Sequence, residues 1–236
     1  MTPQAVILVG GLGTRLAEEF PDIPKGLVPV NGRPFLEWQL EWLRRGGITR
    51  ILLAAGHKAE VFERYLMHRP SDGMVIVLSR EPGPLGTGGA LRYAHAQDLL
   101  ANDPVLILNG DTLIPNFDLS TVFHGVEKSF PPCGKIFVAP IENAGRYGTV
   151  EFGADGIVAA FREKAKRDAG FVNAGIYLLP LDLIASIPPG QAVSIEKEIF
   201  PELVRQRRLV AVPVSPPLLD MGTLDGLAKM EAFLQA

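Results

Sequence analysis

Short apolar runs and longer amphipathic segments alternate through the first 140 residues of the chain. Apolar runs typical of buried strands lie at residues 5–9, 48–55, 74–79, 105–108 and 135–140. Apolar residues recur at helical spacing between them, at residues 34–47, 58–67, 88–100 and 119–128. The first of these segments ends in Gly46-Gly47, which is typical of a helix C-terminus. Strands that alternate with crossover helices predict an α/β fold with a doubly wound, mostly parallel sheet.

The pattern changes after residue 140. The stretch "YGTVEFGADGIVAAF" predicts two short strands around 153–156, and "FVNAGIYLLP" predicts another strand. No repeat or low-complexity linker separates this part from the rest. We therefore expect one domain over residues 1–236, in which 1–140 forms the α/β core and 141–236 adds a smaller β lobe.

Composition and charge exclude several classes of protein. With 47% hydrophobic residues the chain can bury a large core, and its net charge of −3 leaves no long basic surface for nucleic acid. The lone Cys133 excludes an intrachain disulfide framework and a cysteine-cluster metal site. No apolar run approaches the roughly 20 residues that span a bilayer, and the N-terminus lacks a signal-peptide pattern. We expect a cytoplasmic protein without nucleic-acid or membrane partners.

Three glycine-rich stretches follow predicted strands: "GGLGTR", "EPGPLGTGGA" and "NGDT". In an open α/β sheet, the carboxyl ends of the strands meet at one edge, where ligands bind. Exposed N–H groups and helix N-termini at that edge favour an anion such as a phosphate. Arg15 and Lys25 add positive charge in the same region, so the sequence predicts a nucleotide or phosphate site.

Two common nucleotide motifs are missing. The stretch "GLGTRL" has Leu16 where the dinucleotide fingerprint has its third glycine, and Lys25 follows a proline rather than a P-loop glycine. An NAD-dependent oxidoreductase and P-loop chemistry are both disfavoured.

Five stretches together carry a family resemblance: "GGLGTRL…PKGLVPVNGRPFLEW", "PLGTGGAL", "NGDT", "FREK" and "VNAGIYLL". In order and over nearly the whole chain, they resemble the sugar-1-phosphate nucleotidyltransferases. Within that family the chain is most similar to the D-glycero-α-D-manno-heptose 1-phosphate guanylyltransferases, with mannose-1-phosphate guanylyltransferases next. Gly26, Thr223 and Leu224 depart from the usual pattern of the heptose enzymes.

The resemblance implies a Rossmann-like nucleotide-diphospho-sugar transferase fold with a small sugar-binding β lobe. It also implies transfer of a nucleoside monophosphate from a nucleoside triphosphate, here expected to be GTP, to a sugar 1-phosphate, with Mg²⁺ and release of pyrophosphate. Mn²⁺ is left open as the metal, since it accepts the same oxygen ligands.

Site residues follow from the matched motifs. Arg15 is expected to stabilise the α-phosphate and the leaving pyrophosphate, and Lys25 to bridge the α-phosphate and the sugar phosphate. The resemblance assigns nucleotide binding to Val9, Gly10, Gly11, Gly13, Thr14, Gly86, Thr87 and Gly88. It assigns sugar-phosphate binding to Asn109, Gly148, Glu163, Lys164 and Asn173, and metal binding to Asp111 and Asp220.

Structural roles compete with these assignments. Asp111, Asn109 and the 86–88 stretch are also explained by turns and helix caps, and Asn173 by a bulged strand. The charges of Arg15, Lys25, Glu163 and Lys164 are also explained by solvated surface positions. Other base specificities of the same family, a catalytically silent nucleotide sensor, and a monomer or a homodimer remain open.

Overall fold

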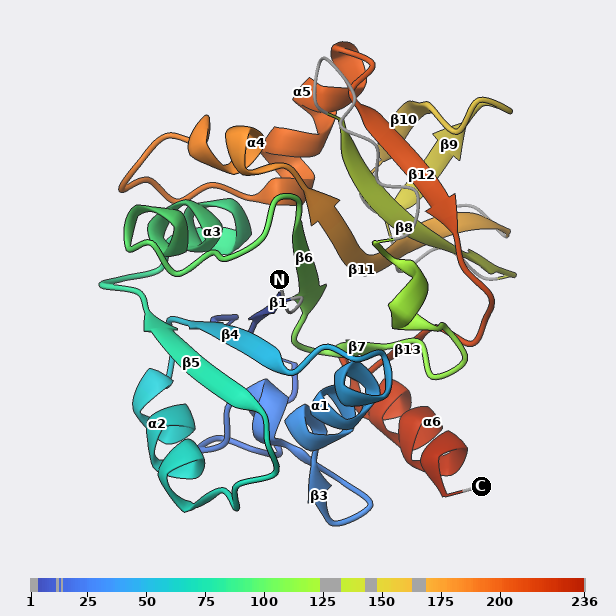
Figure 1. Cartoon of the computed structure of the whole chain (residues 1–236). Helices are drawn as coiled ribbons and strands as arrows, with labels where there is room; N and C mark the ends of the chain where they lie inside the picture. Colours follow the sequence, from blue (N-terminus) through green and yellow to red (C-terminus); the bar gives the residue numbers. More distant parts are fainter. Residues whose placement is uncertain are drawn as a thin grey trace.

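The computed structural model describes residues 4–11, 13, 15–123, 133–142, 148–162 and 169–235. Its centre is a nine-stranded sheet (Figure 1). Seven strands follow one path: β10 (Val158–Arg162), β9 (Thr149–Phe152), β11 (Gly170–Leu179), β6 (Val105–Asn109), β1 (Gln4–Leu8), β4 (Arg50–Ala55) and β5 (Val75–Arg80). Two more strands, β8 (Gly134–Ile141) and β12 (Leu209–Pro213), extend the sheet beside β11.

The parallel part of the sheet consists of β6, β1, β4 and β5, as the sequence predicts. The predicted strand at 135–140 needs a correction, because β8 does not join that parallel part. It pairs antiparallel with β11 and parallel with β12, both from the second half of the chain. Its apolar run is typical of a buried strand in either place, so the sequence pattern could not distinguish the neighbours.

Helices cover both faces of the sheet. Successive strand residues face opposite sides, so Ile7 packs in one apolar cluster and Val6 in the other. The Ile7 side is covered by α1 (Phe35–Arg45), α2 (Ala59–His68) and α6 (Leu224–Leu234). The Val6 side is covered by α3 (Gly86–Ala96), α4 (Leu181–Ala185) and α5 (Phe200–Arg205). The doubly wound arrangement predicted from the alternation is confirmed (Figure 1).

Three of the four predicted crossover helices are confirmed as α1, α2 and α3, with ends shifted by a few residues. The fourth, at 119–128, is described only in part, and there it is the 3-10 helix η2 (Leu119–Thr121). Residues 124–130 lie outside the described part. None of the helices that the structure describes has the length and apolarity needed to cross a membrane.

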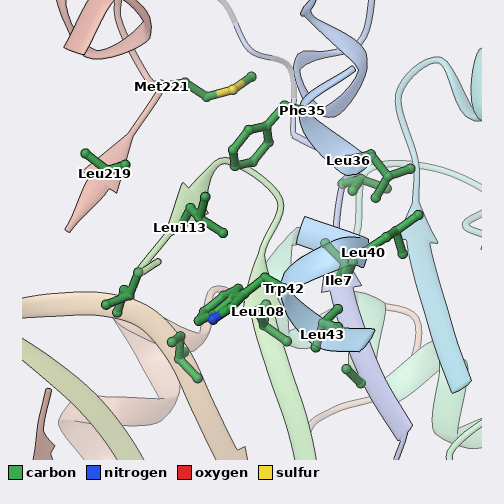
Figure 2. Packing of buried hydrophobic residues seen from close by; sticks show 14 of the residues in the cluster. Ile7, Phe35, Leu36, Leu40, Trp42, Leu43, Leu108, Leu113, Leu219 and Met221 are labelled. Atoms are coloured by element: carbon green, nitrogen blue, oxygen red, sulfur yellow. The ribbon is translucent and has the colours of Figure 1, made fainter. Parts of the chain in front are cut away.

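A small strand pair lies beside the main sheet. Here β7 (Thr112–Leu113) pairs antiparallel with β13 (Leu219–Asp220), so that Asp220 is opposite Thr112. Leu219 and Met221 are buried in the apolar cluster on the Ile7 side of the sheet, near Leu113 and Phe35 (Figure 2). Because side chains alternate along a strand, Asp220 points away from that core.

The remaining short elements are the hairpin strands β2 (Pro29–Val30) and β3 (Arg33–Pro34), the 3-10 helix η1 (Lys25–Leu27) and the π-helix η4 (Ile195–Ile199).

Candidate functional site

A cavity of about 370 Å³ lies where β1, β4 and β6 end and α3 begins, and is called the main cavity below. All three glycine-rich stretches contribute to its wall, as the sequence predicts for the carboxyl edge of a parallel sheet. Its lining residues are Leu8, Val9, Gly10, Gly11, Lys25, Gly26, Ala54, Glu81, Pro84, Leu85, Gly86, Thr87, Ala90, Asn109, Gly110, Asp111 and Glu196.

The loop after β1 forms one wall of the main cavity. The Val9 amide donates to the Ala54 carbonyl at 2.9 Å and is therefore part of the sheet rather than available to a ligand. At Gly10 a side chain would come within 2.9 Å of both Glu81 Oε1 and the Gly56 amide nitrogen, so only glycine fits there. Gly10 is thus required by packing against Glu81 and Gly56, and the binding of a nucleotide by this loop stays a prediction.

Arg15 lies apart from the cavity lining. It is exposed in the turn at 15–19, which begins where the Gly13 carbonyl accepts from the amides of Leu16 and Ala17 at 3.0 and 3.1 Å. Thr14 lies outside the described residues. Both assigned roles stay predictions.

The 86–88 stretch combines structural contacts with a place in the cavity wall, and its assignment to nucleotide binding stays a prediction. The Gly88 amide donates to the Val193 carbonyl at 2.8 Å, and Gly88 does not line the main cavity. The Thr87 hydroxyl accepts from the Ile195 amide at 2.8 Å and donates to Glu196 at 3.0 Å. These groups join the start of α3 to the 193–196 segment, so the structural alternative accounts for them. Gly86 and Thr87 still line the cavity.

The two predicted metal-binding carboxylates lie close together although 109 residues separate them in the sequence. Pairing of β7 with β13 places Asp220 beside Asp111, and the Met221 amide donates to the Asp111 carbonyl at 3.1 Å. Asp111 Oδ2 accepts from the Lys25 ammonium group and Oδ1 from the Thr112 hydroxyl. Lys25, the second predicted catalytic residue, therefore lies at this carboxylate pair.

The carboxylate pair fits a hard cation such as Mg²⁺. Within the described residues no group of three or more His, Cys, Asp or Glu side chains could hold a metal alone. Mg²⁺ is commonly held by one or two carboxylates, with the remaining positions taken by substrate phosphates and water. Asp111, which lines the main cavity, and Asp220 on the paired strand match that ligand set.

Glu81 is a functional candidate that the sequence reading missed. Its side chain lines the main cavity, the residue is only 9% exposed, and Oε2 accepts from the Leu85 amide at 3.2 Å. Burial raises the pKa of this carboxyl, and the Leu85 hydrogen bond lowers it by less. An acidic residue directly after the β5 strand, within the glycine-rich stretch, was the available signal.

Glu196 is the second candidate that the sequence reading missed. It lines the same cavity from η4, and neither Glu196 nor Glu81 forms an ion pair within the described part of the chain. Nothing in "SIEKE" distinguishes this glutamate from its acidic neighbour in the sequence alone. Only folding shows that Glu196, and not Glu198, faces the cavity.

The predicted sugar-phosphate residues are placed in part. Asn109 lines the main cavity. The backbone amide of Asn173 donates to the Gly148 carbonyl at 2.9 Å, so Asn173 and Gly148 lie side by side. The register of β11 shifts between Asn173 and Tyr177, so the bulge anticipated as an alternative is present. Glu163 and Lys164 lie outside the described residues, and their roles stay predictions.

Over residues 4–236 the sequence matches the family model described as "Nucleotidyl transferase". The chain belongs to the nucleotidyl transferase family. This nucleotidyl transferase is 33% identical over 232 residues to a D-glycero-alpha-D-manno-heptose 1-phosphate guanylyltransferase of Aneurinibacillus thermoaerophilus, covering 98% of each chain. The enzyme of the same name from Campylobacter jejuni is 35% identical, covering 93% of this chain and 94% of its own.

Solved structures agree with the sequence comparison. HddC from Yersinia pseudotuberculosis matches this nucleotidyl transferase with a TM-score of 0.85 at 28% identity, over 98% of this chain and 99% of its own. The structure of the same protein complexed with GMP-PN gives a TM-score of 0.83 at the same identity and coverage. The predicted family and fold type are thereby confirmed.

Proposed function

We propose that this nucleotidyl transferase transfers GMP from GTP to a sugar 1-phosphate of the manno-heptose or mannose type. An oxygen of the sugar phosphate attacks the α-phosphorus of GTP, the bond from the α-phosphorus to the bridging oxygen breaks, and pyrophosphate leaves. The products are a GDP-sugar and pyrophosphate. The relatives named as heptose 1-phosphate guanylyltransferases support this choice of base and sugar.

Glu81 is the observation that carries the choice of guanine. It places two carboxylate oxygens in the wall of the main cavity, without a cation partner in the described part of the chain. An ionised carboxylate only accepts hydrogen bonds, and it accepts two in parallel. Guanine offers two adjacent donors, N1–H and the 2-amino group. Uracil, thymine, cytosine and adenine each place an acceptor next to their donor, so a carboxylate pairs less well with them.

The reaction needs positioning and charge neutralisation more than a general base. The second pKa of a phosphate monoester is about 6, so the attacking oxygen is largely ionised at neutral pH. We assign Lys25 to hold the α-phosphate and the sugar phosphate together, and Arg15 to reach from its exposed turn to the triphosphate.

Asp111 and Asp220 would hold Mg²⁺, which supplies positive charge against the phosphate oxygens when bound. Asn109, Gly148, Glu163, Lys164 and Asn173 would bind the sugar 1-phosphate. A cytoplasmic location, where nucleoside triphosphates are available, completes the proposal.

The test combines nucleotide binding with turnover. Thermal unfolding with Mg²⁺ and each of GTP, ATP, UTP, dTTP and CTP measures binding without a sugar, because a ligand of the folded state raises stability. Pyrophosphate release is then followed with α-D-mannose 1-phosphate and with D-glycero-α-D-manno-heptose 1-phosphate. We expect a selective GTP shift and GTP-dependent pyrophosphate release.

Asp111→Asn serves as the matched inactive variant, since it keeps the side-chain shape and removes the charge. A larger shift with another triphosphate would discard guanine. GTP binding with no release of pyrophosphate from GTP in the presence of either sugar 1-phosphate would support the sensor alternative instead.

A further inference from the structure

Glu196 is held by three hydroxyl groups. Its Oε1 accepts from the Tyr177 phenol at 3.1 Å, and its Oε2 accepts from Thr87 at 3.0 Å and from Ser194 at 3.1 Å. Thr87 belongs to the nucleotide side of the main cavity, and Tyr177 belongs to β11 of the second half. Glu196 therefore connects the two parts of the site through hydrogen bonds alone.

The hydrogen bonds beyond Glu196 have a fixed direction. A carboxylate only accepts, so the Tyr177 hydroxyl must donate to it, and the phenol oxygen is left to accept. Asn173 Nδ2 donates to that oxygen at 2.9 Å, while Asn173 Oδ1 accepts from the Gly175 amide at 2.9 Å. The orientation of the Asn173 side-chain amide is thus set by its two hydrogen bonds. The negative charge on Glu196 determines which group donates and which accepts in each hydrogen bond of the series.

The phenol at the centre of this chain stays protonated. Tyr177 is fully buried, and burial together with the negative charge of Glu196 raises its pKa well above the ordinary value. Hydrogen bonds from Asn173 and Asn109 act in the opposite direction on this pKa. Asn173, which is assigned to the sugar phosphate, therefore donates to a neutral hydroxyl group.

The local backbone supports these side-chain positions. Glu196 lies in the first turn of the π-helix η4, a geometry that is frequent at functional sites, and Ser194 caps that helix. On β11, Gly175 has a φ of 68° and a side chain there would lie 3.0 Å from Asn109 Nδ2. Gly175 thus lies against both the Asn109 side chain and the Asn173 amide oxygen.

We propose that Glu196 is a positioning residue for the sugar 1-phosphate: through Tyr177 it orients the Asn173 amide so that its remaining N–H group faces the sugar. This inference rests on the proposed function. It predicts that a change in the series of hydrogen bonds from Glu196 through Tyr177 to Asn173 weakens sugar binding, even where every buried polar group keeps a hydrogen-bond partner.

Tyr177→Phe removes only the hydroxyl and keeps the ring that packs on Phe200 at a centroid distance of 5.1 Å. We expect the KM for the sugar 1-phosphate to rise roughly tenfold, since the Asn173 amide loses its acceptor, while the KM for GTP changes less than about twofold. Tyr65→Phe is the matched control, because Tyr65 also donates to a glutamate, Glu37, but outside the main cavity. It should leave both KM values unchanged.

Glu196→Gln reverses the chain without changing its shape. If Thr87 and Ser194 keep donating, the glutamine oxygen faces these two hydroxyls and its amide group faces Tyr177. The phenol then donates toward Asn173, whose amide must turn its own donors against the Gly175 N–H. We expect a lower melting temperature and a sugar KM raised roughly tenfold or more. Glu198→Gln on the same helix, where Oε1 caps the Ser194 amide, is the control.

The double variant Glu196→Gln with Asn173→Asp separates positioning from simple hydrogen-bond satisfaction. The introduced carboxylate accepts from both Tyr177 and Gly175, so every buried group regains a partner and the melting temperature should recover. The sugar KM should stay high, because a carboxylate has no N–H group for the sugar. Recovery of the sugar KM together with stability would overturn the positioning role.

Kinetics of the wild-type protein come first, with α-D-mannose 1-phosphate and the manno-heptose 1-phosphate as probes. If GTP releases no pyrophosphate with either sugar 1-phosphate, the proposed function is overturned, and the positioning role with it. Normal wild-type turnover with an unchanged sugar KM in Tyr177→Phe and Glu196→Gln would overturn only the positioning role.

Discussion

Two clusters of carboxylate groups in this protein differ in whether a cation lies beside them. Between α1 and α2, Arg69 binds Glu37 at 2.7 Å and Asp72 at 2.6 Å, and Tyr65 donates to Glu37. We call these four residues the Arg69 cluster; they line a second cleft of about 640 Å³. Here each carboxylate has its cation, and the pKa of Asp72 falls to about 2, chiefly through its hydrogen bond with Arg69.

The main cavity holds Glu81 and Glu196 without such cations in the described part of the chain, and burial raises the pKa of Glu81. A buried charge without a counter-ion opposes folding, and a counter-ion with good hydrogen-bond geometry reduces that cost. The Arg69 cluster therefore has the electrostatics of a structural element, and the main cavity has those of a ligand site. The predictions below test that contrast, in order of decreasing effect.

Lys25→Ala should have the largest effect, and only on catalysis. Loss of a charge that stabilises the transition state costs about 10²–10³-fold in kcat. The free energy of unfolding should change by less than about 1 kcal/mol, because the Lys25–Asp111 pair is partly exposed. Single-turnover pyrophosphate release and urea denaturation measure the two effects. Lys229→Ala, in an exposed pair with Asp225, is the control, and near wild-type turnover of Lys25→Ala would refute the assigned role.

Arg69→Met should show the reverse. The Arg69 side chain is 10% exposed, and its loss leaves Asp72 without its cation and Glu37 with only the longer contact to Arg33 at 3.9 Å. This should lower the free energy of unfolding by about 2–3 kcal/mol. Neither KM should change. Arg44→Met, in an exposed pair with Glu41, should leave the free energy of unfolding nearly unchanged in the same denaturation measurement. A rise in the KM for GTP at full stability would contradict the separation between the two clusters.

Glu81→Gln should weaken selection for GTP without weakening the fold. One N–H acceptor is lost from a bidentate contact, which corresponds to roughly a tenfold lower kcat/KM for GTP. The melting temperature should stay the same or rise, because burial disfavours the ionised form of Glu81. Initial rates with GTP and UTP, next to the exposed control Glu60→Gln, test this. A lower melting temperature with unchanged base selection would assign Glu81 to structure.

The pH dependence should separate the clusters by sign. Glu81 has a pKa raised above 4.5, so as pH rises through its folded-state pKa the folded protein loses a proton that it held more tightly than the unfolded chain, and stability falls. Asp72 has a pKa lowered from 3.8 to about 2, so its stabilisation is present above 3.8 and is lost as pH falls toward 2. The Asp72 effect is small, since its side chain is 36% exposed.

Differences in melting temperature between wild type and Glu81→Gln, and between wild type and Asp72→Asn, measure each group against pH. The KM for GTP should also rise in acid, because protonated Glu81 loses an acceptor, and Glu81→Gln should flatten that rise. If the difference in melting temperature from wild type changed with pH in the same direction for Glu81→Gln and Asp72→Asn, the proposed contrast between the main cavity and the Arg69 cluster would be refuted.

Three features of this protein follow from the sequence alone: the parallel core of the sheet, its covering helices and the edge at which ligands bind. Apolar runs and helical spacing are local properties, and the carboxyl ends of parallel strands meet wherever those strands pair. Alternation in "LLDM" also places Asp220 opposite to Leu219 and Met221, which require burial. The family resemblance added the roles of Arg15, Lys25 and the two aspartates, which stay predictions.

Contacts between distant parts of the chain determine which polar groups face the cavity and which hold the fold together. The Gly88 amide and the Thr87 hydroxyl are satisfied by the 193–196 segment, more than 100 residues away in the sequence. Glu81, Glu196 and Tyr177 acquire their roles from neighbours brought by other strands and by a π-helical turn. Hydrogen bonds and burial depend on those distant neighbours, and a local sequence pattern contains no information about them.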